Sequence, residues 1–353
     1  MRSYRCRLKI LSPTIIGDSR SQRGVYTATH IIPGHTLGGA INRELARKYE
    51  LSSMTSRGLV ISSPAYPARE GSEAIPAHPF YYECKVCDDL RFSTLREGSL
   101  LKVVKDGLTG VRNEVIMLKC GVGHLLKSLH PRPIMLIQGK VVKTSVLVQP
   151  LISVGINRHT ASSQTGLLYE YTAIEPGREY WFTLASIDDL EVPNKLEVRL
   201  GRGTSRGFGR ALIEVIEREV KFSYDIEPDS WIMMYALSPV PARYINKRLE
   251  LKESANNYGL GGVDGSLEPV MVFGKLESFN LGWPHGSPVS RGRITCLVAG
   301  SVIIYRWAER PTNPLESLRV LRFLGMPLRL TTDVIHGLCM LHPFREEPLL
   351  EVR

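Results

Sequence analysis

Hydrophobic and polar positions alternate in many short segments of the chain. A two-residue period is typical of half-buried strands. It runs through YRCRLKIL (4–11), REYWFTLASI (178–187) and KLEVRL (195–200), and residues 134–156 are dense in Val and Ile. The pattern predicts an α+β fold with mixed or antiparallel sheets.

Helical spacing occurs in two segments. Leu37, Ala40, Ile41 and Leu45 share one face of a predicted helix that Thr36 can cap. The second helix is predicted within PLESLRVLRFLG (314–325).

The chain is long enough for two domains with their own cores. Residues 52–80 are rich in Ser, Pro and Ala and have no clear period, so we interpret 51–133 as an insertion outside the core sheet. The acidic, proline-containing segment DIEPD (225–229) marks a boundary. The sequence therefore predicts a first domain over 1–224, interrupted by the insertion, and a second over 225–353.

The composition is that of an ordinary globular protein, with a formal net charge of +10. Such an excess favours polyanionic partners, although solubility or an acidic partner would also account for it. The basic residues are dispersed, which suits a folded surface rather than a basic tail. No apolar run approaches the length of a membrane span, and the N-terminus lacks a secretory signal, so a cytoplasmic location is expected.

The segment from Gly201 to Arg210 contains four glycines, three arginines and two hydroxyl side chains. Glycines permit positive φ and close approach to a ligand, and arginine and hydroxyl groups donate to phosphates. No Walker A or dinucleotide-binding spacing is present, and the residues that follow favour a strand. The alternative is a tight turn with solvated arginines. The candidate RNA-binding residues of this loop are Gly201, Arg202, Gly203, Ser205, Arg206, Gly207, Phe208 and Arg210.

Two further segments are candidates for contact with RNA. The amide-rich helix start at Gly34, His35 and Thr36 could receive a phosphate, or could serve only to begin the helix. Arg158 and His159 lie at the polar tip of a predicted hairpin. An exposed His there could act in acid–base cleavage of RNA, but such a residue is usually only polar.

Cys84, Cys87, Cys120 and His124 have the residue types and pair spacings of a tetrahedral zinc site. Structural zinc would stabilise an insertion that has little core of its own. The alternative is that the cysteines are merely buried and that His124 is a surface residue.

No hydrolase motif of the G-x-S-x-G or H-E-x-x-H type is present. Three segments resemble the RAMP superfamily of CRISPR-associated proteins: Ile-Pro-Gly-x-x-Leu-x-Gly-Ala at 32–40, Asn-Arg-x-Thr…Gly-Leu-Leu-Tyr at 157–169, and Gly-x-Gly-x-Ser-Arg-Gly-Phe-Gly at 201–209. Residues 282–305, with Gly-Trp followed by Ala-Gly-Ser-Val-x-x-Tyr, resemble the second domain of the five-family-like subunit of type III-D (Csm/Cmr-like) effector complexes.

The resemblance implies two ferredoxin-like (RRM-like) domains and a non-catalytic subunit that caps the repeat-derived 5′ handle of the CRISPR guide RNA. The implied partners are the guide RNA, the large polymerase-like subunit and the backbone RAMP subunits. Asn157 stands where many relatives carry Asp, which leaves the role of that position open.

Two other functions remain open from the sequence. A backbone RAMP subunit would cleave target RNA with an aspartate, for which Asp18 or the pair Asp88 and Asp89 are the candidates. A guide-processing endoribonuclease would need a catalytic histidine, for which His35 and His159 are the candidates.

Overall fold

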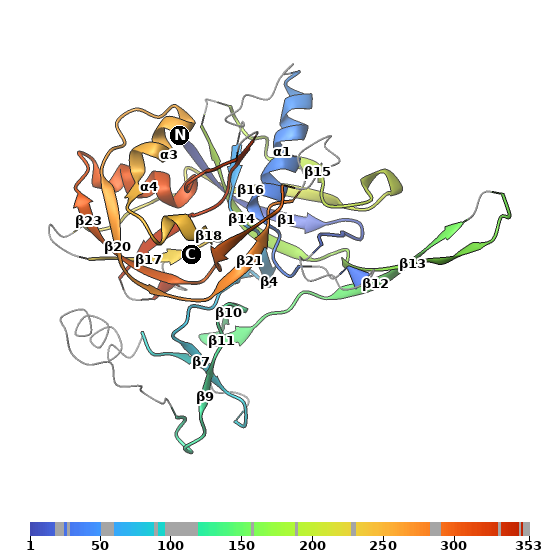
Figure 1. Cartoon of the computed structure of the whole chain (residues 1–353), viewed down its shortest axis with the longest axis horizontal. Helices are drawn as coiled ribbons and strands as arrows, with labels where there is room; N and C mark the ends of the chain where they lie inside the picture. Colours follow the sequence, from blue (N-terminus) through green and yellow to red (C-terminus); the bar gives the residue numbers. More distant parts are fainter. Residues whose placement is uncertain are drawn as a thin grey trace.

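The computed structural model describes residues 1–17, 25–26, 29–50, 60–87, 91–95, 119–156, 159–187, 190–226, 231–282, 291–330, 333–345 and 347–348. Within these ranges the chain is mostly β with few helices, as the α+β expectation requires (Figure 1). Among the described residues, no helix has both the length and the apolar character needed to cross a membrane.

The first sheet is antiparallel and is built mainly from residues before position 220. Its spatial order is β15, β16, β1, β14, β4 and β5, and β3 also pairs with β14. Strand β3, which follows α1 in the chain, therefore lies two places from β1, with β14 between them. The elements are β1 (Arg2–Ile10), α1 (Gly34–Lys48), β3 (Val60–Ser62), β4 (Tyr66–Arg69), β5 (Ser72–Glu73), β14 (Glu179–Ser186), β15 (Lys195–Arg199) and β16 (Arg210–Arg218).

This sheet corrects the predicted start of the insertion. Residues 52–80 were expected to lie outside the core sheet, yet β3 and β4 pair with β14 in antiparallel register. Ser62 lies opposite Leu184, and Tyr66 lies opposite Trp181. These strands are short and contain Ser and Pro, so they show no hydrophobic period, although most of their residues are buried.

The second sheet repeats the same connectivity. Its spatial order is β19, β20, β23, β17 and β26, with antiparallel pairing throughout. Strand β20, which follows α3 in the chain, again lies two places from the first strand, β17, with β23 between them. The elements are β17 (Ile232–Ala236), β19 (Leu249–Glu250), α3 (Leu251–Tyr258), β20 (Ser266–Phe273), β23 (Val302–Glu309), α4 (Pro314–Phe323) and β26 (Leu341–Phe344).

Helix α1 packs its apolar stripe against the first sheet. Leu37, Ala40, Ile41 and Leu45 are all buried there, as predicted. The prediction of Thr36 as the cap is wrong. The helix begins at Gly34 with Pro33 as its N-cap and without a side-chain cap, because the fixed φ of proline suits this entry.

Strand β14 is buried on both faces. Tyr180, Phe182 and Leu184 pack with α1, whereas Trp181 and Ala185 belong to a core that also contains residues of the second sheet and α4. Two-sided burial explains the almost continuous apolar run of this strand. One hydrophobic cluster therefore spans the two halves, and the first half has a second cluster of its own around α1.

Arg322 of α4 is also buried at this junction. Its Nη1 donates to Thr183 Oγ1 of β14 at 3.5 Å, and its Nε donates to His342 Nδ1 of β26 at 3.2 Å. Burial and the neighbouring Arg5 lower the pKa of Arg322 to about 9. Burial and Arg322 lower the pKa of His342 well below its usual value, so the imidazole is neutral and can accept this hydrogen bond.

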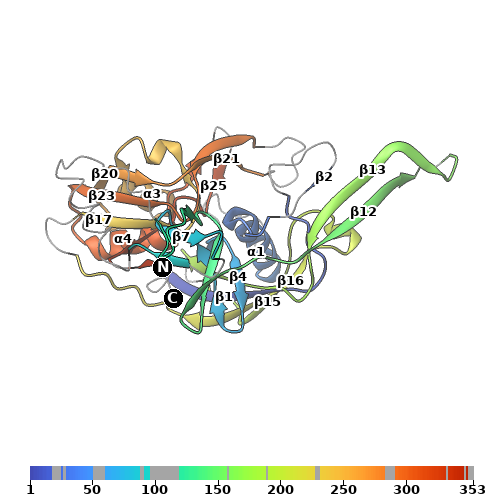
Figure 2. The same cartoon turned by 90° about the horizontal axis from the view of Figure 1, so that it is seen from below.

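Smaller sheets complete the structure. In Figure 1 a long arm of β12 and β13 extends from one side of the body, and β7 and β9 lie beyond another. Figure 2 shows the same separation of the arm. The remaining strands are β2 (Val25–Tyr26), β6 (Ile75–Pro76), β7 (Tyr81–Cys84), β8 (Arg91–Ser93), β9 (Leu126–Ser128), β10 (Pro133–Ile137), β11 (Lys140–Lys143), β12 (Val148–Ile156), β13 (Ser163–Ile174), β18 (Val240–Pro241), β21 (Leu276–Asn280), β22 (Arg293–Leu297), β24 (Leu328–Arg329) and β25 (Val334–Ile335).

We predict that Phe182→Ala lowers the free energy of unfolding by about 3–5 kcal/mol, because it removes a fully buried ring between β14 and α1. Ile152→Ala, on the arm, changes it by less than about 0.5 kcal/mol because that side chain is 71% exposed. Denaturant titration measures both, and equal effects would contradict this account of the core.

Candidate nucleic-acid interface and metal centre

The glycine-rich loop joins β15 to β16, so a strand follows it, as predicted. Gly201, Gly203, Gly207 and Gly209 have φ of 73°, 72°, 87° and 77°, in the left-handed region. At Gly209 an added Cβ would lie 1.9 Å from the carbonyl oxygen of Leu200, and at Gly201 it would lie 2.2 Å from that of Ile15. Backbone crowding therefore requires glycine at both ends of the loop.

Most loop amides are used within the protein. Arg202 N donates to Ile15 O and Gly209 N donates to Pro13 O, each at 2.9 Å, which ties the loop to the segment after β1. Arg206 N and Phe208 N both donate to Gly203 O. The loop thus presents side chains to the outside more than free backbone donors.

The exposed side chains of the loop are Arg202, Ser205, Arg206 and Arg210. The Arg206 guanidinium lies 5.8 Å from the ring centroid of half-buried Phe208. The Nε of Arg210 donates to Glu197 Oε1 at 2.8 Å. That hydrogen bond lowers the pKa of Glu197, so the two opposite charges persist as a pair at neutral pH.

Residues 13–15 connect the loop to the root of the arm. The sequence analysis did not predict this connection. Thr14 forms a β-bridge with Ile174 at the end of β13, and Ile15 forms one with Arg202. The arm and the loop are therefore neighbours on one side of the molecule (Figure 2). The segment Ser-Pro-Thr-Ile-Ile has no periodicity that could have indicated this position.

The other candidate RNA contacts lie apart in the chain. Gly34 is buried at the start of α1, where an added Cβ would lie 2.4 Å from Ser62 O, whereas Thr36 is half-buried. His159 is exposed at the tip of the arm. Arg158 lies outside the described residues, as do Asn157, Asp18, Asp88 and Asp89.

His35 is half-buried against residues of the second half of the chain. Its ring lies edge-on to Phe279 at 5.7 Å, and an added Cβ at Gly282 would be 3.5 Å from its Nε2. Burial and Arg291 lower the pKa of His35 to about 4. The imidazole is therefore neutral at physiological pH.

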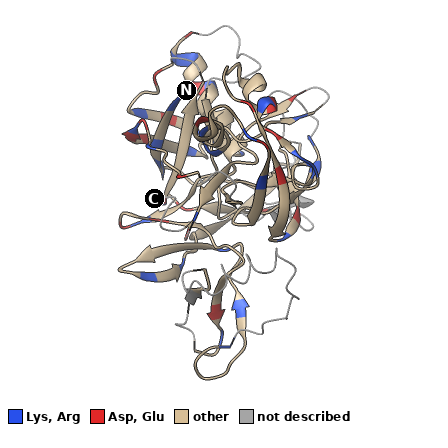
Figure 3. Cartoon of the chain, turned by 90° about the vertical axis from the view of Figure 1, so that its left-hand side faces the viewer, with Lys and Arg blue, Asp and Glu red and all other residues tan. Residues whose placement is uncertain are grey.

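Charged residues of both signs are spread over the body (Figure 3). Several cations of the β15–β16 hairpin are paired: Lys195 Nζ lies 2.9 Å from Glu214 Oε1, and Arg218 Nη1 lies 2.9 Å from Glu191 Oε1. A hydrogen bond from Lys195 lowers the pKa of Glu214. Such exposed pairs reduce the local positive potential of the strands.

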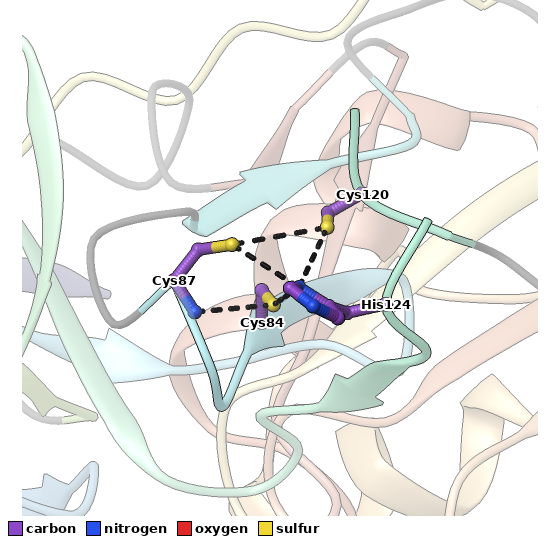
Figure 4. A group of neighbouring side chains, drawn as sticks. All are labelled: Cys84, Cys87, Cys120 and His124. Atoms are coloured by element: carbon purple, nitrogen blue, oxygen red, sulfur yellow. Dashed lines mark hydrogen bonds between the residues drawn. The ribbon is translucent and has the colours of Figure 1, made fainter. Parts of the chain in front are cut away.

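The structure brings Cys84, Cys87, Cys120 and His124 together (Figure 4). Their three sulfur atoms and His124 Nδ1 all lie within 4.8 Å of one another. Cys84 and Cys87 lie at and just after the end of β7, and Cys120 and His124 precede β9, so pairing of β7 with β9 closes the long sequence gap. This cluster could hold a metal ion.

Backbone hydrogen bonds shape the second half of the cluster. Cys120 N donates to His124 O at 2.9 Å, and Gly123 N donates to Cys120 O at 2.8 Å. Burial raises the pKa of Cys120, but hydrogen bonds from the Val122 and His124 amides and the other two thiols outweigh it and lower this pKa to about 6. A thiolate is the form of cysteine that binds metals.

No family model matches the chain. No curated protein matches it either. Among solved structures, the chain is similar to a chain of type III-B Cmr-beta bound to cognate target RNA and AMPPnP, with 15% identity over 85% of this chain and 86% of that chain and a TM-score of 0.48. It is also similar to a chain of Cmr-beta bound to cognate target RNA, with 16% identity, the same coverage and a TM-score of 0.48.

Cmr4 (Cas7) of Pyrococcus furiosus is similar at 11% identity over 61% of this chain and 99% of that chain, with a TM-score of 0.25. The Cmr-beta structures are of type III-B. They share the type III class, but not the III-D subtype, with the sequence resemblance.

We predict that Gly207→Ala lowers the free energy of unfolding by about 1 kcal/mol, because positive φ disfavours a side chain there but space is available. Gly209→Ala adds a clash with the Leu200 carbonyl and lowers it by at least about 3 kcal/mol. Thermal and denaturant unfolding compare the two variants. A smaller loss for Gly209→Ala would show that the loop tolerates a backbone shift.

We predict about one metal ion per chain, which Cys84→Ser removes and Cys296→Ala, a buried cysteine outside the cluster, retains. Elemental analysis of purified protein measures the content. Metal-free native protein, or equal content in both variants, would rule out the metal centre.

Proposed function

We propose that this protein is a non-catalytic, guide-RNA-binding subunit of a type III CRISPR effector complex, and that it caps the repeat-derived 5′ handle. The observation that carries the proposal is the glycine-rich loop. Its shape is set by backbone contacts, and its tip carries two exposed arginines and a hydroxyl beside the root of a projecting arm. Guanidinium and hydroxyl groups are typical donors to an RNA backbone.

The connectivity supports the fold that the sequence resemblance implies. When the four main strands of each sheet are numbered along the chain, their spatial order is 4-1-3-2, which is that of the ferredoxin-like split β-α-β motif. These strands are β16, β1, β14 and β3 in the first sheet, and β26, β17, β23 and β20 in the second. The second half carries both helices of the motif, α3 and α4. In the first half, β15 follows the third strand and precedes the fourth along the chain, where the motif has its second helix. We therefore propose two ferredoxin-like domains, with the predicted division near residues 224 and 225.

The surroundings of His35 support the non-catalytic assignment. Its half-buried imidazole packs edge-on against Phe279, and with a pKa of about 4 it carries no proton to donate as a general acid at neutral pH. A backbone subunit cleaving target RNA with an aspartate is the second candidate, and its aspartates lie outside the described residues. Loss of target cleavage after Asp18→Ala in the assembled complex would favour it.

Zinc is the metal that we propose for the cysteine–histidine cluster. In a tetrahedral site with Zn–S of about 2.3 Å and Zn–N of about 2.0 Å, neighbouring ligands lie about 3.8 Å apart for two sulfurs and about 3.5 Å apart for sulfur and nitrogen. Cys87 Sγ and Cys120 Sγ are 3.9 Å apart, and their distances to His124 Nδ1 are 3.4 and 3.6 Å. Four protein ligands fill the coordination sphere, so zinc there would hold the ends of β7 and β9 together.

We predict that Arg202→Ala/Arg206→Ala weakens binding of single-stranded RNA, because two phosphate-directed cations are lost. The slope of log K against log salt falls by roughly one to two units. Lys275→Ala/Arg306→Ala, which removes two exposed cations paired with glutamates, serves as the charge-matched control. If both double variants give the slope of the native protein, the loop is only a structural turn.

Purification of the tagged protein from its native host tests the whole proposal. Short RNAs with a common repeat-derived 5′ end, recovered together with a large partner subunit, are the expected result. Heterogeneous RNA or none would remove the support for guide binding. Cleavage of unprocessed repeat RNA by the purified protein would instead identify a guide-processing enzyme.

A further inference from the structure

A basic pocket of about 490 Å³ lies in the second half of the chain, remote in sequence from the glycine-rich loop. It is formed by the short turn η2 (Ala242–Tyr244), helix α3 and the start of β24. Four cationic side chains line it, against one carboxylate, that of Glu253. The cations are Arg243, Lys247, Arg248 and Arg329.

Arg329 is oriented by a neutral acceptor. Its Nε donates to Asn257 Oδ1 at 2.7 Å, and its Nη2 donates to the same oxygen. The Asn257 amide is fixed in turn, because its Nδ2 donates to the backbone oxygen of Glu253 at 2.7 Å. The guanidinium is thus held in place while its charge stays uncompensated.

Arg243 is held in the same way on another wall. Its Nη2 donates to the backbone oxygen of Pro327 at 3.2 Å and to Tyr244 Oη. The guanidinium lies 4.5 Å from the centroid of the Tyr244 ring, and Tyr244 Oη donates to Pro327 O at 2.8 Å. An exposed guanidinium that lies over a ring offers its other face to a nucleobase.

Three of the four pocket cations differ from most of the arginines around them. Arg306 is paired with Glu268, and Arg291 is paired with Asp333. The fourth pocket cation, Arg248, is also paired, since it lies 3.5 Å from Glu250 and 3.0 Å from Glu309. Among the described residues, by contrast, Arg243, Lys247 and Arg329 form no ion pair with a carboxylate.

We propose that this pocket binds the phosphate group of a nucleotide, either within an RNA strand or as a free nucleotide. Three uncompensated cations around one concave space attract a multiply charged anion, and two pre-oriented guanidinium groups match the geometry of phosphate oxygens. Glu253 opposes the anion and limits the affinity. The proposal does not rest on the glycine-rich loop or on guide binding.

The test compares Lys247→Ala/Arg329→Ala with the control Lys275→Ala/Arg306→Ala in the full chain. Both remove two exposed cations, but only the first removes residues of the pocket. The probes are a fluorescently labelled single-stranded RNA and AMP. We expect the pocket variant to weaken binding of one or both probes about tenfold at low salt, and the control to change it less than about twofold.

The two probes separate the two sources of the phosphate. Weakened binding of RNA alone assigns the pocket to an RNA strand, whereas loss of AMP binding assigns it to a free nucleotide. Glu253→Gln should strengthen binding of the same probe, since it removes the opposing charge. Equal behaviour of the pocket variant and the control towards both probes would overturn the proposal.

Failure of this inference differs from failure of the proposed function. If Arg202→Ala/Arg206→Ala weakens RNA binding and the pocket variant matches its control, only the pocket proposal fails. If the pocket variant loses binding and the loop variant does not, the loop is structural and the pocket remains.

Discussion

The burial of β14 from both sides is the constraint on which the rest of the structure depends. Its Phe182 face packs against α1, and its Trp181 face packs into the core shared with the second sheet and α4. Neither half could expose that second face to water without losing much of its stabilisation. The position of the glycine-rich loop relative to the second half therefore follows from core packing rather than from a flexible linker.

The strongest periodic signals of the sequence were sufficient for the main elements. β1, β14, β15 and β16 and the helices α1 and α4 lie where alternation and helical spacing predicted them. The members of the cysteine–histidine cluster were also predictable, because cysteine and histidine pairs at this spacing are typical of metal sites. Pairing of β7 with β9 then brought together residues that are far apart in the chain.

Features set by tertiary contacts were not readable from the sequence. Strands β3 and β4 were assigned to the insertion because their Ser and Pro residues give no period, and only pairing with β14 makes them strands. Residues 13–15 gained their role from bridges to Arg202 and Ile174, which lie more than 150 positions away. The pocket around Arg329 likewise unites segments whose local patterns contain no common signal.

The crowding around Gly201 and Gly209 has an entropic consequence. A loop whose backbone is held by hydrogen bonds to Pro13 and Ile15 has few alternative conformations before any ligand arrives. The entropic cost of ordering the loop is met when the protein folds, so an RNA strand bound there, as proposed, would have to order only the arginine side chains. Binding at this loop should accordingly be nearly rigid-body recognition, with affinity set by a few long side chains and little change in the heat capacity of the loop itself.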